Sequence, residues 1–275
     1  MQPLRRILIF SKDRAVQLLA LLESLKLQCL DFEESIVTVL YKTTSSQHQN
    51  QYIEIQEMFP SINFRRDKEL STDFLNVVIN SQYIMFLVDD SILVREFRFS
   101  DVITALDENL DCIGFSLRLG KNITYSYPHD SNQDKISFSE LDNKMLKLDW
   151  TQHTYDFGYP MEISSSVYRS FDVLELAMGV KFSSVNNIES VLDAKKALLK
   201  KDKPMLMCFP VSHAFANPIN ITSGLVGNRV GSNVDYSLNS LADEFDAGYK
   251  VDVSSFKDFT PIGCHQEVSL SWIER

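Results

Sequence analysis

The chain has 275 residues, of which 44% are hydrophobic and 23% charged, values typical of a globular protein with a sizeable core. Its formal net charge of −10 argues against binding of a nucleic-acid backbone or a basic membrane anchor, because both need a positively charged surface. No segment approaches the roughly 18 apolar residues of a membrane-spanning helix, and the apolar run at 7–10 is too short for a secretory signal. We expect a cytoplasmic protein without a membrane span; peripheral membrane contact stays open.

Strands and helices alternate in the first half of the chain. Apolar and β-branched runs predict strands, and helical spacing of apolar residues predicts helices between them. The strands are expected at 5–10, 35–41, 61–65, 83–88 and 112–117, and the helices at 15–27, 48–59 and 70–81. This alternation predicts an α/β fold, with a mostly parallel central sheet flanked by helices.

The second half has a different composition. Residues 120–160 are rich in Tyr, Asp, Asn and Ser, and helical periodicity returns only afterwards. We expect helices at 167–178, 188–201 and 238–245, and strands at 205–209 and 268–272. The glycines of GLVGNRVG, at 224–231, indicate either a loop that closes over a substrate or an ordinary surface loop. We predict one domain over 1–275, with a nucleotide-binding half (1–119) and an acceptor-facing half (120–275).

Two adjacent carboxylates, Asp89 and Asp90, follow the apolar run at 84–88. That run is typical of a strand buried on both faces, and open α/β sheets bind ligands at the carboxyl ends of their strands. Mg²⁺ and Mn²⁺ often reach a protein through one or two carboxylates together with substrate phosphates. One of the two acids would equally suit the cap of a turn. The pair predicts a divalent-metal site.

Several common catalytic motifs are absent. The sequence contains neither a P-loop nor the GxGxxG fingerprint, and it has no GxSxG nucleophile motif. What remains is a metal-supported diphosphate site, in which the cation offsets charge on a leaving nucleoside diphosphate. A general base would then activate the incoming hydroxyl.

Six segments together carry a family resemblance: ILIFSKDRAVQL, FLVDDSI, GFSLRLGKN, DFGYPMEISSSVYRS, VNNIESVL and CHQEVSLSW. With them the chain resembles GT-A-type glycosyltransferases, close to bacterial glycosyltransferase family 2 proteins. The resemblance implies a Rossmann-like domain, a nucleoside-diphosphate sugar donor, Mn²⁺ or Mg²⁺ as cofactor, and transfer to a carbohydrate or other hydroxyl acceptor. It further implies inversion at the anomeric carbon and a role in polysaccharide or glycoconjugate synthesis. The usual DxD triplet is Asp89-Asp90-Ser91 here, which leaves open which acid contacts the metal.

The resemblance also implies contacts with the nucleotide sugar near the ends of strands. The substrate-binding candidates are Phe10, Ser11, Arg14, Tyr41 and Arg118. Each has an ordinary structural alternative. Ser11 suits a helix cap, Tyr41 suits the core, and Arg118 suits a surface ion pair.

Three further residues complete the candidate site. Glu189 is the candidate general base, although an acid in the first turn of a helix also interacts favourably with the helix dipole. Asp156 is a competing base or a ligand of the acceptor hydroxyl, and His265 is a possible third metal ligand.

Two other classes of protein stay open. A sugar-1-phosphate nucleotidyltransferase would need a glycine-rich loop that FSKDRAVQL lacks. The second is a non-catalytic carbohydrate-binding module on the same fold.

Overall fold

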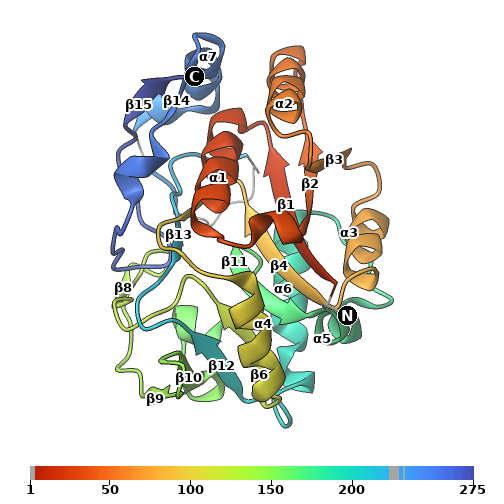
Figure 1. The fold of residues 1–275 in the computed structure, drawn as a ribbon, viewed down its shortest axis with the longest axis vertical. Coiled ribbons are helices and arrows are strands. Elements are labelled where there is room, and N and C mark those ends of the chain that lie inside the picture. Colours follow the sequence, from red (N-terminus) through yellow and green to blue (C-terminus); the bar gives the residue numbers. More distant parts are fainter. Residues whose placement is uncertain (1–3, 223–228, 232) are drawn as a thin grey trace.

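The computed structural model describes residues 4–222, 229–231 and 233–275, so most of the predicted loop at 224–231 lies outside the described residues. A sheet with helices on both sides forms the centre of the molecule (Figure 1). Within the described residues this sheet has nine strands, in the order β3-β2-β1-β4-β11-β6-β12-β10-β9. The strands are β1 (Arg5–Lys12), β2 (Ile36–Lys42), β3 (Asn63–Arg66), β4 (Tyr83–Val88), β6 (Cys112–Ser116), β9 (Ser139–Glu140), β10 (Leu146–Asp149), β11 (Ser165–Arg169) and β12 (Met205–Cys208).

The sheet is mostly parallel. Of its nine described strands, β11 and β10 run against the direction that the other seven share. The predicted α/β class, with a mostly parallel central sheet flanked by helices, is therefore confirmed. Strands from both sides of residue 119 contribute to this sheet.

Two hydrophobic cores lie on opposite faces of the sheet, because side chains alternate along each strand. Ile7 and Ile9 of β1 belong to the core that includes residues of α1, α2, α4 and α7. Leu8 and Phe10 belong to the core that includes residues of α3, α5 and α6. The helices are α1 (Ala15–Gln28), α2 (Ser46–Met58), α3 (Leu70–Ile79), α4 (Phe99–Glu108), α5 (Ser170–Ala177), α6 (Val185–Lys195) and α7 (Leu238–Asp246).

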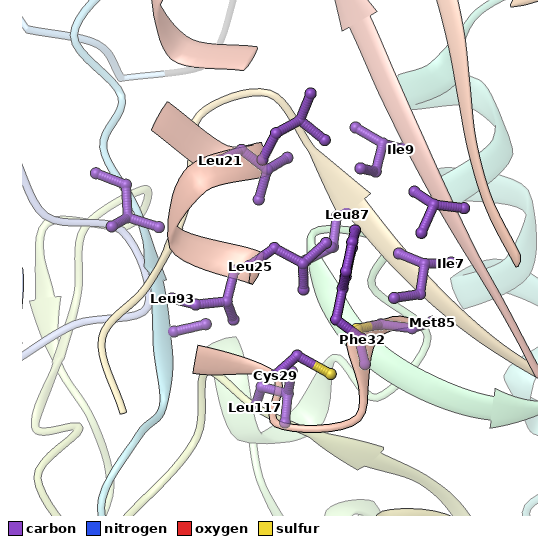
Figure 2. Close-up of a cluster of buried hydrophobic side chains, with 14 of the residues drawn as sticks. Ile7, Ile9, Leu21, Leu25, Cys29, Phe32, Met85, Leu87, Leu93 and Leu117 are labelled. Atoms are coloured by element: carbon purple, nitrogen blue, oxygen red, sulfur yellow. The ribbon is translucent and has the colours of Figure 1, made fainter. Parts of the chain in front are cut away.

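Helix α1 is attached to the sheet by a cluster of buried aliphatic side chains. Figure 2 shows this cluster, which includes Leu21, Leu25, Ile7, Ile9, Met85 and Leu87. Burying one such side chain stabilises the fold by about 1.5–3 kcal/mol. The cluster helps to hold β1 beside β4 in the parallel register that pairs Phe10 with Val88. As a result, the carboxyl ends of the two strands lie next to each other.

The predicted helix over 167–178 is wrong at its start. Residues 165–169 form β11, which inserts antiparallel between β4 and β6, and α5 begins at Ser170. The run of serines at 164–166 gave no apolar strand pattern. The hydroxyls of Ser164 and Ser166 donate to Glu162, two and four positions away, and the strand partners β4 and β6 are distant in sequence. The terminal strand was expected at 268–272 and is β15 (Trp272–Glu274), which pairs with β14 (Tyr249–Val251).

Several elements of the fold had no sequence prediction. They are helix α4, strand β10, and two small antiparallel pairs, β5 (Ser91–Leu93) with β13 (Ala214–Ala216) and β7 (Tyr125–Ser126) with β8 (Ser131–Asn132). The pairing of β5 with β13 brings the segment after residue 216 to the acid pair, because the Asn217 amide donates to the Asp90 carbonyl at 2.8 Å. Among the helices that the structure describes, none has the length and apolar character to cross a bilayer.

Candidate active site

A cavity of about 370 Å³ lies at the carboxyl ends of β1 and β4. This is the edge at which open α/β sheets bind ligands. The cavity brings together nine of the ten predicted site residues: Phe10, Ser11, Arg14, Asp89, Asp90, Arg118, Asp156, Glu189 and His265. We call the part formed by Arg14, Asp89 and Asp90 the acid-pair end. The part formed by Arg118, Asp156 and Glu189 is called the Glu189 end.

Tyr41 is the predicted site residue that the cavity does not include. Its side chain is buried in the core, with its ring stacked on that of Tyr52 at 5.0 Å between centroids. Tyr52 in turn shares a hydrogen bond with Ser11. The structure therefore gives Tyr41 the core position that was its alternative interpretation, one layer behind the cavity wall.

Asp89 is a buried carboxylate with both oxygens engaged. Its Oδ2 accepts from the Ser11 hydroxyl at 2.9 Å and from the Lys12 amide at 3.0 Å. Its Oδ1 accepts from Arg14 Nη1 at 2.8 Å. These bonds connect the end of β4 to the end of β1. Asp89 therefore serves mainly to hold the two strand ends together.

Asp90 is half-buried and faces the cavity with one oxygen. Its Oδ2 accepts from Arg14 Nη1 at 3.2 Å, whereas within the described residues its Oδ1 has no hydrogen-bond donor. Burial raises the pKa of Asp90 to about 6, and the neighbouring Asp89 adds to this effect while Arg14 opposes it. Asp90 is thus the acid of the pair that is available to a ligand.

Arg14 connects the two acids to Asn220, in the segment that follows β13. Its Nε donates to Asn220 Oδ1 at 2.8 Å, and its Nη2 donates to the Asn220 carbonyl at 2.5 Å. With Nη1 bonded to both aspartates, the guanidinium is fixed in place. Arg14 pairs with both acids and also lines the cavity, so its contact with a nucleotide stays a prediction.

The donor set limits how a metal could bind. Within the part of the chain that the structure describes, no three His, Cys, Asp or Glu side chains gather to hold a metal ion. The predicted set of Asp89, Asp90 and His265 is therefore not assembled as a three-residue site. Asp90, with an unbonded oxygen at the cavity, still fits a cation that takes its remaining ligands from water and substrate phosphates.

The Glu189 end contains a buried arginine among carboxylates. Arg118 is 4% exposed, and it lies 3.7 Å from Asp156 (Nη1 to Oδ1) and 3.6 Å from Glu162 (Nε to Oε1). Its Nε is among the described buried atoms that have no hydrogen-bond partner. Asp156 also accepts from Gln133 Nε2 at 2.5 Å. Arg118 is a buried counter-ion rather than a surface one.

Glu189 faces the cavity from the second turn of α6, because this helix begins at Val185 and not at 188 as expected, so its alternative role as a first-turn acid is wrong. The helix begins after Ser184, whose hydroxyl accepts from the Asn187 amide at 3.1 Å, a favourable N-cap. Glu189 Oε1 accepts from the Ile163 amide at 3.2 Å. Burial raises the pKa of Glu189 to about 7, Glu162 adds to this rise, and Arg118 opposes it. A carboxyl group with this pKa can accept a proton near neutral pH.

His265 reaches the cavity from the C-terminal segment, where it bridges to Ala216. Burial lowers the pKa of His265 to about 4, and the positive charge of Arg118 acts in the same direction. Its Nδ1 has no hydrogen-bond partner among the described residues. His265 is therefore a neutral imidazole near pH 7, able to accept or donate one hydrogen bond but not to balance a negative charge.

Sequence reasoning missed residues that complete both ends. Asn220 fixes Arg14, and no local pattern around it could have revealed this, since the two are 206 positions apart. Glu162 lies inside DFGYPMEISSSVYRS, and the run of serines after it was a usable signal for a bound carboxylate. Tyr127, Tyr155 and Tyr159 line the cavity, and the sequence showed them only as part of an aromatic-rich segment.

Comparison with known proteins supplies a relative for part of the chain. No family model matches. Over 202 residues the chain is 30% identical to the bifunctional glycosyltransferase pgtA of Dictyostelium discoideum. The matched region covers 66% of this chain and 26% of pgtA, so the chain spans about a quarter of that relative's length.

Two solved structures show partial likeness in chain path. Staphylococcus aureus TarS in complex with UDP-GlcNAc is 11% identical, with a TM-score of 0.49 over 79% of this chain and 59% of the other. GalNAc-T7 with UDP, GalNAc and Mn²⁺ is 9% identical, with a TM-score of 0.49 over 87% of this chain and 47% of the other.

Proposed function

We propose that this chain is a glycosyltransferase that moves a sugar from a nucleoside-diphosphate sugar to a hydroxyl acceptor. The observation that carries the proposal is the cavity itself, which joins an acid pair at one end to a carboxyl group with a pKa near 7 at the other. The sequence similarity to pgtA supports the same class. Residues 1–119 would supply the nucleotide side and residues 120–275 the acceptor side of one domain.

At the acid-pair end, Asp90 would hold Mn²⁺ or Mg²⁺ through its unbonded oxygen. When bound, the cation offsets the negative charge of the diphosphate leaving group. Asp89 keeps the ends of β1 and β4 together, and Arg14 balances part of the negative charge of the two aspartates. Phe10 and Ser11 form the cavity wall on the nucleotide side.

At the other end, Glu189 would accept the proton of the acceptor hydroxyl as that oxygen attacks the anomeric carbon. Asp156 is held by Gln133 and Arg118, which suits it to binding a second hydroxyl group rather than to proton transfer. Tyr155 and Tyr159 offer ring surfaces that suit a carbohydrate acceptor. A base opposite the leaving group gives inversion at the anomeric carbon. Polysaccharide or glycoconjugate synthesis is the setting that the family resemblance implies.

Nucleotide binding tests this proposal. Calorimetric titration with UDP, GDP and CDP, each with and without Mn²⁺, should reveal one nucleotide whose affinity rises with the metal. Asp90→Asn should remove that metal effect, and Asp142→Asn, at an exposed loop position, is the matched control. Absence of metal-enhanced binding for every nucleotide would contradict the metal-supported site.

The same material separates the other classes. A sugar-1-phosphate nucleotidyltransferase would release pyrophosphate when given a nucleoside triphosphate and a sugar 1-phosphate. A non-catalytic module would bind carbohydrate without any dependence on nucleotide. A glycosyltransferase releases nucleoside diphosphate from a nucleotide sugar, at least slowly to water, and a coupled assay for the diphosphate detects it.

A further inference from the structure

Glu162 is a buried carboxylate that the proposed chemistry does not use. It is 1% exposed, and it lies just before β11. The amides of Ser164 and Ser165 donate to its Oε2 at 2.5 and 3.1 Å, and the hydroxyls of Ser164 and Ser166 donate to its two oxygens. Four donors hold this buried carboxylate in one orientation. Glu162 therefore places a fixed negative charge inside the fold.

This charge lies beside Glu189. The Ile163 amide donates to Glu189 Oε1 at 3.2 Å, and the next amide, of Ser164, donates to Glu162. Neighbouring amides of one backbone segment thus hold the two carboxyl groups. Glu189 lines the cavity, whereas Glu162 is not among its lining residues. Glu162 therefore acts on a ligand in the cavity without contacting it, through the groups that line the cavity, Glu189 and Arg118 among them.

We infer that Glu162 is a positioning residue, whose fixed negative charge favours proton uptake by Glu189. The inference rests on the proposed function, in which Glu189 takes the proton of the acceptor hydroxyl. Without that charge, Glu189 would lose its proton at lower pH and would be a weaker base when the hydroxyl attacks. Arg118, 3.6 Å from Glu162, limits the effect so that Glu189 is still able to ionise.

The charged groups that face Glu189 determine the sign of the effect. Burial, Glu162 and then Asp193, one turn further along α6, raise the pKa of Glu189. Arg118 and the Ile163 amide lower it. Removing the charge of Glu162 leaves Arg118 with one carboxylate fewer to balance, so its effect on Glu189 grows. Both consequences lower the pKa of Glu189.

The substitution Glu162→Gln tests this inference, because it removes the charge and keeps the shape. Carboxyl carbons of labelled glutamates, followed by NMR over a pH series, report the Glu189 titration directly. We expect its midpoint to fall by about one pH unit, the size that a nearby charge can produce. The acid limb of kcat/KM should move by the same amount in the same direction.

Asp193→Asn is the matched control, since it removes the weaker like charge from the same surroundings. It should lower the Glu189 midpoint by less than Glu162→Gln does. A Glu189 midpoint that is unchanged in Glu162→Gln would overturn the inference. If the NMR midpoint moves and the kcat/KM profile does not, the coupling between the carboxyl groups stands and Glu189 is excluded as the base of the proposed function.

Arg118→Gln provides a second variant in case Glu162→Gln does not fold. It removes the positive charge that offsets Glu162, and so the pKa of Glu189 should rise above that of the wild type. Adding Glu162→Gln to this variant should then lower the Glu189 midpoint again, because the double variant differs from Arg118→Gln only by the charge of Glu162. A midpoint that stays the same or rises in the double variant would overturn the inference.

Discussion

The two ends of the cavity both place carboxylates beside a buried arginine, yet the pairing differs between them. At the acid-pair end, Arg14 Nη1 lies 2.8 Å from Asp89 and 3.2 Å from Asp90. At the Glu189 end, Arg118 lies 3.6 and 3.7 Å from Glu162 and Asp156. Asp89, with three donors, and Glu162, with four, have both oxygens engaged and act as structural ions. Among the described residues, Asp90 and Glu189 each accept through one oxygen alone. The comparison teaches that the donors around a carboxylate decide its role more than its burial does.

The largest expected effect is at Asp90. Asp90→Ala should abolish transfer, because the diphosphate would lose the carboxylate that holds its cation. Since Asp90 is half-buried and Arg14 keeps its bonds to Asp89 and Asn220, the free energy of unfolding should change by no more than about 1 kcal/mol. Turnover of nucleotide sugar and thermal denaturation measure the two quantities. Unchanged turnover would move the metal site elsewhere.

Glu189→Gln should have the next largest effect. Loss of a general base typically lowers kcat by roughly 10²–10⁴-fold. Binding of the nucleotide should stay at the wild-type level, because the acid-pair end is untouched, and calorimetry checks this directly. Asp156→Asn separates the two candidate bases. If it costs more in kcat than Glu189→Gln does, the assignment of the roles is reversed.

Asp89→Asn should mainly affect stability. Removing one partner of a buried ion pair costs about 3–5 kcal/mol. The Asn side chain has one acceptor oxygen, so it cannot replace the two carboxylate oxygens that accept from Ser11 and from Arg14. Chemical denaturation measures the loss. Asp90→Asn is the matched comparison at the adjacent position. Equal stability of the two variants would contradict the division between a structural and an available aspartate.

The smallest effect is a change in how stability depends on pH. The pKa of Glu189 is about 7 in the folded protein, above the ordinary glutamate value of an unfolded chain. The folded state therefore binds more protons between these two values, and this contribution to stability is lost as the pH rises towards 7. The free energy of unfolding of the wild type, taken relative to that of Glu189→Gln, should therefore fall as the pH rises from the ordinary glutamate pKa towards 7. A constant difference would show that Glu189 titrates normally.

The parts of the fold that could be predicted are those with local signals. The run at 83–88 and the helical spacing at 15–27 correspond to β4 and α1, since burial imposes a periodic pattern on each. The strand β11 gave no such signal, because it begins with two serines, whose hydrogen bonds to Glu162 no apolar pattern reveals. Its neighbouring strands, β4 and β6, are also distant in sequence. Helix α4 was missed although its apolar spacing is regular.

The site shows the same limit. The position of Asp89 and Asp90 after a buried strand was a local signal, and the cavity does lie there. Which of the two is available depends on Arg14 and Asn220, whose contact spans 206 positions. Tyr41 ends a strand at the right edge, but its ring turns to Tyr52 rather than to the cavity. Side-chain direction at a strand end is decided by tertiary packing.

A crystal structure with a nucleotide sugar and Mn²⁺ would show directly whether the cavity is the donor site. We expect a diphosphate next to Asp90, with the cation between them, and a sugar whose anomeric carbon faces the space in front of Glu189. A nucleotide bound outside this cavity, or a cation that does not touch Asp90, would contradict this expectation.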